Sequence, residues 1–284
     1  MPKLTHTFAM FKSSGLLILL LCCILAGCET VTDPGDIPYV ERLVVEATLD
    51  DGAPIDDIRI TRTMPLDRKY DREAAIVRDV NGFVEVDGTR HNLQYDAARG
   101  VYTVPLTATR GKEYRLTAEW NGRKATARTT VPIPPIIDSI SADTMAFYDP
   151  GMVFYTSLDI LFTPIDRRAV YGIGIRTVMD GYPMTVLHLG YGEPIFRLRD
   201  TNDQGKILYH YGRTDSPYNY GISGGRGTTV ATVYAFDEQF FDYYSSRYRS
   251  DDISFSQEED IRWNIEGDGI GLFMGRSKVE IDVP

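Results

Sequence analysis

The chain has 284 residues, with 40 acidic residues against 30 lysines and arginines, so its formal net charge is −10. A body this acidic is repelled by phosphate backbones and anionic lipid surfaces, which argues against nucleic acid as a partner. All three cysteines, Cys22, Cys23 and Cys28, lie near the N-terminus. The rest of the chain therefore has no disulfide, zinc–cysteine cluster or cysteine nucleophile.

An apolar run near the N-terminus has the length of a secretory signal. Lys3 and Lys12 precede the apolar residues Leu16 to Ala26. This run is too short for a helix spanning about 30 Å of hydrocarbon, which takes roughly 20 residues, but it fits the apolar core of a signal peptide. The alternative interpretation is an incomplete transmembrane helix followed by an incidental cysteine.

The sequence that ends this run resembles the lipobox of bacterial lipoproteins. Leu25, Ala26 and Gly27 stand directly before Cys28. The resemblance implies that residues 1–27 are a signal peptide, that cleavage falls between Gly27 and Cys28, and that the Cys28 sulfur carries a diacylglycerol. Two or more acyl chains, including an N-acyl group such as palmitate, anchor a protein stably to a membrane. No other cofactor is expected.

Residues 28–38 are predicted to be a lipid-anchored tether. The segment "ETVTDPGDIP" at 29–38 contains two prolines, one glycine and three acids. It has little to bury, which indicates a flexible linker with a fully extended reach of roughly 33 Å. Acids soon after the lipid-bearing cysteine resemble the export signals of surface lipoproteins in Bacteroidota. Display at the cell surface and at the periplasmic face both stay open.

Residues 39–131 are predicted to form a β-sandwich. Short segments of alternating apolar and polar residues are separated by turn-forming sequences, and none has a convincing helical pattern. The Asn121-Gly122 pair predicts a type I′ hairpin turn. Gly-x-Tyr pairs resemble those of prealbumin-like and carboxypeptidase-regulatory-like sandwiches. The predicted strands cover residues 42–49, 57–63, 82–88, 91–96, 100–106, 113–120 and 123–131.

A proline-rich junction at residues 132–137 is predicted to end this domain. Pro132, Pro134 and Pro135 stiffen the chain and cannot donate to a strand ladder. Beyond it, residues 138–284 are predicted to form a second β-rich domain with one short amphipathic helix. The predicted strands of this domain cover residues 152–164, 169–179, 184–191, 206–212 and 228–237.

The helix is predicted at residues 237–249. Asp237 is its expected N-cap, and Phe240, Tyr244 and Tyr248 fall on one face at a spacing of four residues. The favoured interpretation is that this face packs on the second sheet. The alternative is an exposed aromatic platform for a ligand.

A glycine-rich stretch near the C-terminus is predicted to be a tight, closely packed return of the chain. Glycines at positions 267, 269, 271 and 275 permit close approach, and Ile270, Leu272 and Phe273 are expected to fill apolar sites. The stretch does not fit a phosphate-binding loop, because no strand–loop–helix unit surrounds it and its acids repel phosphate.

The order of these features is familiar. "YVERLVVEATLDDGAP" follows the lipobox, "VPIPPIIDSIS" forms the junction, and "NIEGDGIGLFMGRS" lies near the C-terminus. This order resembles the Bacteroidota lipoprotein family labelled domain of unknown function 4249. The resemblance implies an outer-membrane lipoprotein, often encoded beside TonB-dependent receptors. It implies no catalytic residues, because the family has none assigned.

One motif resembles a hydrolase site. Gly221 to Gly225 fits the Gly-x-Ser-x-Gly pattern, with Ser223 as the nucleophile. That arrangement needs a strand before the serine and a helix after it, whereas a turn-rich stretch precedes it and a strand follows. A glycine loop is the simpler interpretation, and no catalytic residue is predicted.

A second motif resembles the start of a calcium loop. Asp200, Asn202 and Asp203 supply oxygen ligands, but Tyr211 stands where a bidentate glutamate is needed. A hairpin turn is the favoured interpretation, and a weak calcium site is the alternative. His188 and His210 lie on separate predicted strands and do not make a metal site by themselves.

These patterns favour a non-catalytic accessory or binding lipoprotein, anchored to the outer membrane through Cys28 and working with a TonB-dependent receptor. One alternative is an envelope-bound hydrolase acting on glycans or peptides. Another is a surface adhesion or structural protein, which the 18 tyrosines and regular β domains would suit.

Overall fold

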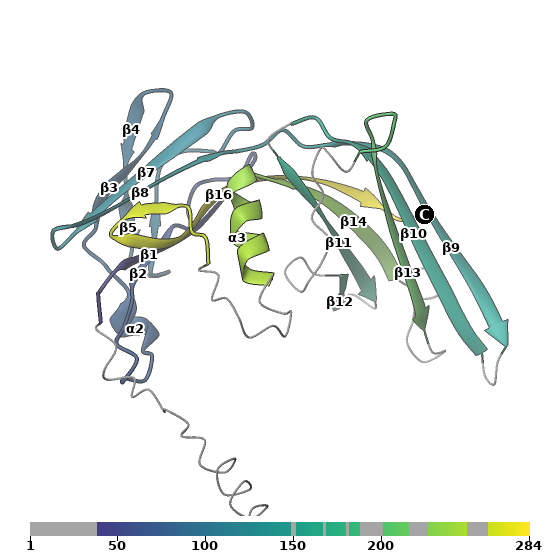
Figure 1. Ribbon diagram of the computed structural model, residues 1–284, viewed down its shortest axis with the longest axis horizontal. Coiled ribbons are helices and arrows are strands. Elements are labelled where there is room, and N and C mark those ends of the chain that lie inside the picture. Colours follow the sequence, from purple (N-terminus) through teal and green to yellow (C-terminus); the bar gives the residue numbers. More distant parts are fainter. Residues whose placement is uncertain are drawn as a thin grey trace, which may run out of the picture. The chain divides into compact units, whose positions relative to one another are not determined.

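The computed structural model describes residues 39–148, 152–166, 169–179, 182–187, 201–215, 227–248 and 261–284 (Figure 1). Within these ranges most residues lie in β-strands, arranged in several sheets with two helices, so the expected mostly β fold is confirmed. Glu41–Met64 and Tyr70–Pro284 form one compact unit. Outside it, the Arg68 amide donates to the Pro65 carbonyl at 3.3 Å in a turn. The predicted signal peptide, Cys28 and tether lie outside the described residues.

A five-stranded antiparallel sheet contains, in order, β15 (Ile265–Gly267), β8 (Arg123–Thr130), β7 (Glu113–Trp120), β3 (Asn81–Val86) and β4 (Thr89–Asn92). Tight turns join β3 to β4 and β7 to β8. The φ angles are 49° at Asp87 and 76° at Gly88 in the first turn, and 48° at Asn121 and 75° at Gly122 in the second. A type I′ turn requires positive φ at both central residues, so the prediction at Asn121-Gly122 is confirmed.

The largest sheet contains, in order, β12 (Tyr182–Leu187), β11 (Val170–Met179), β14 (Gly227–Phe236), β16 (Gly269–Asp282), β1 (Leu43–Asp50) and β2 (Arg59–Arg62). The first half of β16 pairs in parallel with β1, and its second half pairs antiparallel with β14. One strand near the C-terminus therefore joins the first strand of the fold to strands from the middle of the chain.

Three more strands form an antiparallel sheet in the order β13 (Ile207–Asp215), β10 (Met152–Thr163) and β9 (Ile136–Tyr148). β9 was not predicted, because it starts inside the segment taken as a junction. Pro132, Pro134 and Pro135 all precede its first residue, so none of them removes a ladder hydrogen bond from β9. A separate two-stranded ribbon joins β5 (Gln94–Asp96) to β6 (Val101–Thr103).

The described residues form two hydrophobic cores on these sheets. The first is built from residues 43–131 together with Ile265 and Phe273 of the two last strands. The second is built from β10, β11, β13 and β14, with the Phe162 and Tyr171 rings 5.7 Å apart. The sequence placed residues 265–276 in the second domain, but the side chains of Ile265 and Phe273 belong to the first core. The boundary at residues 132–137 stays a prediction.

The glycine-rich C-terminal stretch forms a long strand rather than only a return of the chain. A Cβ atom at Gly275 would lie 2.5 Å from the Thr130 carbonyl oxygen of β8. Phe273 is fully buried, and Ile270 and Leu272 are half-buried. The close approach expected of these glycines is therefore confirmed, and it is what lets β16 pass against β1 and β8.

Two helices accompany the sheets in the described part of the chain. α3 (Glu238–Tyr248) confirms the predicted helix, and its N-cap Asp237 accepts a hydrogen bond from the Gln239 amide at 3.3 Å. α2 (Arg72–Ala75) is a single turn that lies between the predicted strands at residues 57–63 and 82–88. The Asp71 carboxylate accepts from the Glu73 and Ala74 amides at 3.0 and 3.2 Å, which satisfies amides that a helix start leaves unpaired. One turn is too short to show helical periodicity in the sequence.

Candidate functional site

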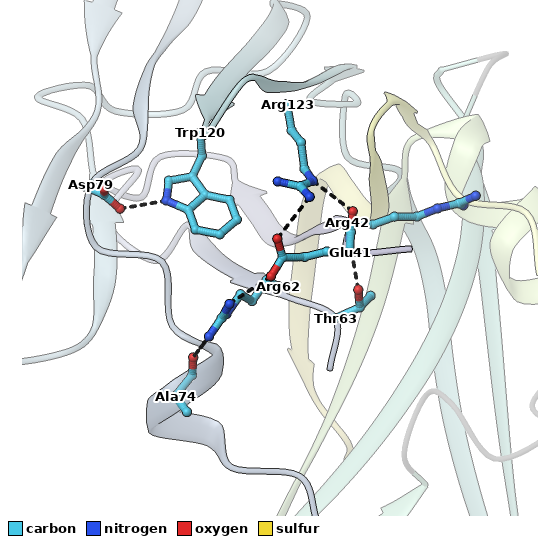
Figure 2. Close-up of polar contacts among 8 residues, drawn as sticks. All are labelled: Glu41, Arg42, Arg62, Thr63, Ala74, Asp79, Trp120 and Arg123. Carbon is cyan, nitrogen blue, oxygen red and sulfur yellow. Dashed lines mark hydrogen bonds and ion pairs between the residues drawn. The ribbon is translucent and has the colours of Figure 1, made fainter. Parts of the chain in front are cut away.

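Glu41, the first residue of the compact unit, is held by two arginines from different strands (Figure 2). Arg62 of β2 binds one carboxylate oxygen at 2.8 Å, and Arg123 of β8 binds the other at 3.1 Å. The Arg123 Nε also donates to the Glu41 carbonyl at 3.0 Å. The Glu41 side chain is only 17% exposed, so these pairs are better shielded from water than ordinary surface pairs.

The same network reaches α2 and the β7–β8 hairpin. The Arg62 Nη2 and Nε donate to the Ala74 carbonyl at 3.2 and 3.3 Å, at the end of α2. On the other side, the Arg123 guanidinium lies 5.8 Å from the centre of the Trp120 ring, whose Nε1 donates to Asp79 at 2.8 Å (Figure 2). We call the three residues Glu41, Arg62 and Arg123 the Glu41 clamp.

A groove of about 590 Å³ lies over the outward face of β1 and β2. Because strand side chains alternate between faces, β1 and β2 bury Leu43, Val45 and Ile60 and direct Glu46 and Arg59 outward. We call it the α2 groove. Its lining comes from β1, β2, the α2 segment and the β5–β6 ribbon with its turn: Val44, Glu46, Arg59, Thr61, Tyr70, Arg72, Glu73, Ile76, Arg78, Tyr95, Ala97, Ala98, Arg99 and Gly100.

Tyr102 holds in place the chain segment after α2, which lines one side of the groove. Its hydroxyl donates to the Val77 carbonyl at 2.8 Å and accepts from the Val80 amide at 3.0 Å, which holds the chain that leaves α2. Burial raises the pKa of Tyr102 above its ordinary value. Its ring lies 5.2 Å from that of Tyr95, a lining residue. The groove is therefore supported by buried contacts and is preformed.

Three of the groove arginines pair with acids at the surface. Arg59 bonds to Asp57 at 3.1 Å, Arg78 to Glu73 at 3.2 Å, and Arg99 to Asp56 at 2.9 Å. These side chains are all exposed to water, so each pair contributes only about 0–1 kcal/mol to stability. Arg72 makes no hydrogen bond or ion pair with the described residues. Exposed arginines with weak partners are suited to exchange those partners for a ligand.

A smaller cavity of about 260 Å³ at the start of α3 has polar groups that are already used. The Asp237 Oδ2 accepts from the Thr129 hydroxyl at 2.6 Å and the Thr130 amide at 2.7 Å, while its Oδ1 caps α3. The Thr129 hydroxyl also accepts from the Gly275 amide at 2.6 Å. These contacts hold β8, α3 and β16 together. The polar groups of this cavity therefore have a structural role.

The predicted calcium loop is only partly described. Asp200 lies outside the described residues. The Asn202 side-chain oxygen accepts from the Gln204 and Lys206 amides at 2.9 and 3.0 Å, and Asp203 is exposed in the same turn. This geometry is that of a tight turn, and the strand that would precede it in a hairpin lies outside the described residues. The described residues contain no group of three or more metal-ligating side chains, and calcium binding itself stays a prediction.

The predicted aromatic face of α3 is described at Phe240 and Tyr244. The Phe240 ring stacks on Phe236 of β14 at 4.3 Å, and the Tyr244 ring lies 5.9 Å from Phe240. Both residues are half-buried, which is the packing expected of the favoured interpretation. The structure does not describe the side chain of Tyr248, and a ligand role for this face stays a prediction.

The whole hydrolase motif, Gly221 to Gly225 with Ser223, lies outside the described residues, and so does His188. His210 on β13 is exposed, and its Nδ1 lies 2.6 Å from the Asp159 carboxylate. Among the described helices none is long and apolar enough to cross a bilayer.

The arginines of the α2 groove and the Glu41 clamp were not predicted from the sequence. They come from segments distant in the chain, so no local spacing identifies them. The one available signal is the concentration of charge in "DRKYDREA" at residues 67–74.

The described residues define a β-rich, multi-sheet protein with a preformed arginine-lined groove. A family model described as Domain of unknown function (DUF4249) matches residues 31–282. The chain belongs to this family, so the expected match to domain of unknown function 4249 is confirmed. No match was found among curated proteins.

Proposed function

We propose that this protein is a lipid-anchored binding lipoprotein of the bacterial outer membrane, without catalytic activity, that works beside a TonB-dependent transporter. The observation that carries the proposal is the lipobox-like sequence ending at Cys28, followed after residues 29–40 by a folded unit beginning at Glu41. A lipid-bearing cysteine and a short linker suit a globular body held beside a membrane and free to move over the length of its tether.

The Glu41 clamp supports this arrangement. A pull transmitted along a tether acts first on the residue where the fold begins. Both the carboxylate and the carbonyl of Glu41 are bonded to arginines of β2 and β8. The start of β1 is thereby fixed to two sheets, which protects the strand end from fraying.

The α2 groove supports binding rather than a purely structural role. Its volume of about 590 Å³ is in the range of about 300–1,000 Å³ typical of small-molecule sites. Its lining combines charged, hydroxyl and aromatic side chains, the mixture that orients a polar ligand.

The anchor is tested by the substitution Cys28→Ser in the native host. We expect the variant to keep the signal peptide, to run at a larger size, and to lose the acyl chains detected on the native protein by mass spectrometry. A protease site inserted at residues 29–38 allows the otherwise native protein to be cut from its lipid. After cleavage, the protein should leave the membrane fraction. Cys23→Ser is the matched control, because it makes the same change inside the apolar run. A Cys28→Ser variant with native size and native acylation contradicts the proposal.

The transporter is tested separately by purification of the native protein from detergent extracts of the outer membrane. We expect a β-barrel receptor in the purified complex, identified by mass spectrometry. Repeated purification without any barrel protein contradicts the partner while leaving the anchor in place.

A further inference from the structure

We propose that the α2 groove binds acidic sugars, that is, ring compounds carrying both carboxylate and hydroxyl groups. The inference rests on the proposed binding function and adds the chemical class of the ligand. It is carried by the charge, the hydrogen-bonding groups and the aromatic side chains of the groove.

The lining of the α2 groove has more basic than acidic residues. It holds four arginines against two glutamates, and Asp56 and Asp57, which lie outside the lining, pair with two of those arginines. The cavity at the start of α3 has four acids against one arginine, and a cavity of about 500 Å³ beside Trp120 has two acids against two bases. Of these three cavities, the α2 groove is the one whose lining has more basic than acidic residues, so it suits an anion best.

The arginines have donors left for a carboxylate. A guanidinium has five N–H donors in a planar fork that matches a carboxylate. Among the described residues Arg99 uses only its Nη1, bonded to Asp56 at 2.9 Å, and Arg59 uses its Nε and Nη2, bonded to Asp57 at 3.1 and 3.2 Å. Asp56 and Asp57 are not part of the groove lining. A ligand carboxylate in the groove therefore meets donors that the protein leaves unused.

The other lining groups fit hydroxyls and a ring. Glu46 and Glu73 accept hydrogen bonds from hydroxyl groups, and the Thr61 hydroxyl donates or accepts. Simple inorganic anions gain nothing from carboxylates in their site. Tyr70 and Tyr95 add aromatic surface, whose electron-rich faces attract the C–H bonds of a sugar ring.

The backbone argues against an extended acidic peptide as the ligand. Peptides often bind by adding a strand to a free sheet edge. The outer edge of β2 is occupied at two places, because the Ile60 carbonyl accepts from the Val77 amide at 3.2 Å and the Ile58 amide donates to the Tyr102 carbonyl at 3.0 Å. Recognition in this groove must therefore use side chains.

The test is calorimetric titration of the mature lipidated protein in detergent with trigalacturonate. Galactotriose, which lacks the carboxylates, and triglutamate, which lacks the sugar rings, are the comparison ligands. We expect trigalacturonate to bind at least tenfold more tightly than either. The double variant Arg59→Gln/Arg99→Gln should weaken its binding at least tenfold.

Arg115→Gln is the matched control. Arg115 bonds through Nε to Glu113, two residues earlier on the chain, at 2.7 Å, as Arg59 bonds to Asp57, but it lies outside the groove. The Arg115→Gln variant should bind trigalacturonate as tightly as the native protein does. A melting scan of each variant separates lost binding from lost folding.

Three results would overturn the inference: no binding of trigalacturonate, equal binding of galactotriose or triglutamate, or equal weakening by Arg115→Gln. None of them touches the proposed function, because acylation of Cys28 and co-purification of a receptor are measured independently. If Cys28 is not acylated while trigalacturonate still binds the groove, the proposed ligand class is retained and the proposed lipid anchor is rejected.

Discussion

Gly271 lies where β16 runs closest to β1. Its φ of 118° is in the region that favours glycine, and a Cβ atom there would clash with the Val45 carbonyl oxygen. The neighbouring atom belongs to the backbone of a buried strand paired along its whole length with β16. Neither β16 nor β1 can therefore move away without breaking hydrogen bonds between the two strands.

We predict that Gly271→Ala lowers the free energy of unfolding by about 3–5 kcal/mol, because the steric clash adds to the strain of the dihedral. Gly111→Ala is the control, since Gly111 has a φ of 78° with nothing within 4 Å of the added Cβ. The control should lose only about 1–2 kcal/mol. Urea unfolding of both variants measures the difference, and equal losses would show that the close approach costs nothing.

At the scale of elements, Asp138 connects three segments of the chain. It lies in β9, accepts from the Thr163 hydroxyl of β10 at 2.7 Å, and pairs with Lys206 before β13 at 2.8 Å. The hydrogen bonds from Lys206 and then Thr163 lower the pKa of Asp138 below its ordinary value. The carboxylate is thus more stable in the folded state than in the unfolded chain.

A lowered pKa gives a defined pH dependence. The stabilisation is complete above the unfolded pKa of about 3.9 and is lost as the pH falls through the lower folded pKa. We predict that Asp138→Asn loses less stability than the native protein between pH 6 and pH 2.5, as measured by urea unfolding. Asp203→Asn is the control, because it removes one exposed charge from the nearby turn without breaking a bond to the described residues. Identical pH profiles for native protein and Asp138→Asn would refute the coupling.

Local patterns predict some elements well and others not at all. The alternation in "EYRLTAEW" gives β7 its bounds, Glu113–Trp120, and Asn121-Gly122 gives its hairpin, because both depend on neighbouring residues. The parallel pairing of β1 with β16 depends on contacts such as Asp50 with Arg276, which are 226 positions apart. Nothing local encodes that register.

The candidate site also has features that local patterns predict and features that depend on distant parts of the chain. The tether and lipobox are local patterns and are predicted directly from the sequence. Arg59, Arg72 and Arg99 meet in the α2 groove only because β2, α2 and the β5–β6 turn are brought together by the fold. Their individual spacing is that of ordinary surface charges, so the groove emerges only from the three-dimensional structure.

For the whole molecule, the shared strand β16 bears on how the two cores unfold. Its residues 269–276 pair with β1, and residues 276–282 pair with β14. Phe273 lies in the first core, and Ile281 packs against the second. Loss of either core therefore removes the partner of half of β16, which weakens the other half of the same strand.

We predict that both cores unfold in one transition, although a chain of this size often unfolds in steps. The chain has two tryptophans, Trp120 beside the first core and Trp263, which lies 5.4 Å from Tyr243 of α3. The variants Trp120→Phe and Trp263→Phe each leave one fluorescent reporter, and their urea midpoints should coincide. Phe273→Ala, which costs about 3–5 kcal/mol, should move both midpoints equally, and so should Ile173→Ala in the second core. Independent cores would instead respond separately, with Phe273→Ala shifting the Trp120 midpoint and Ile173→Ala leaving it unchanged.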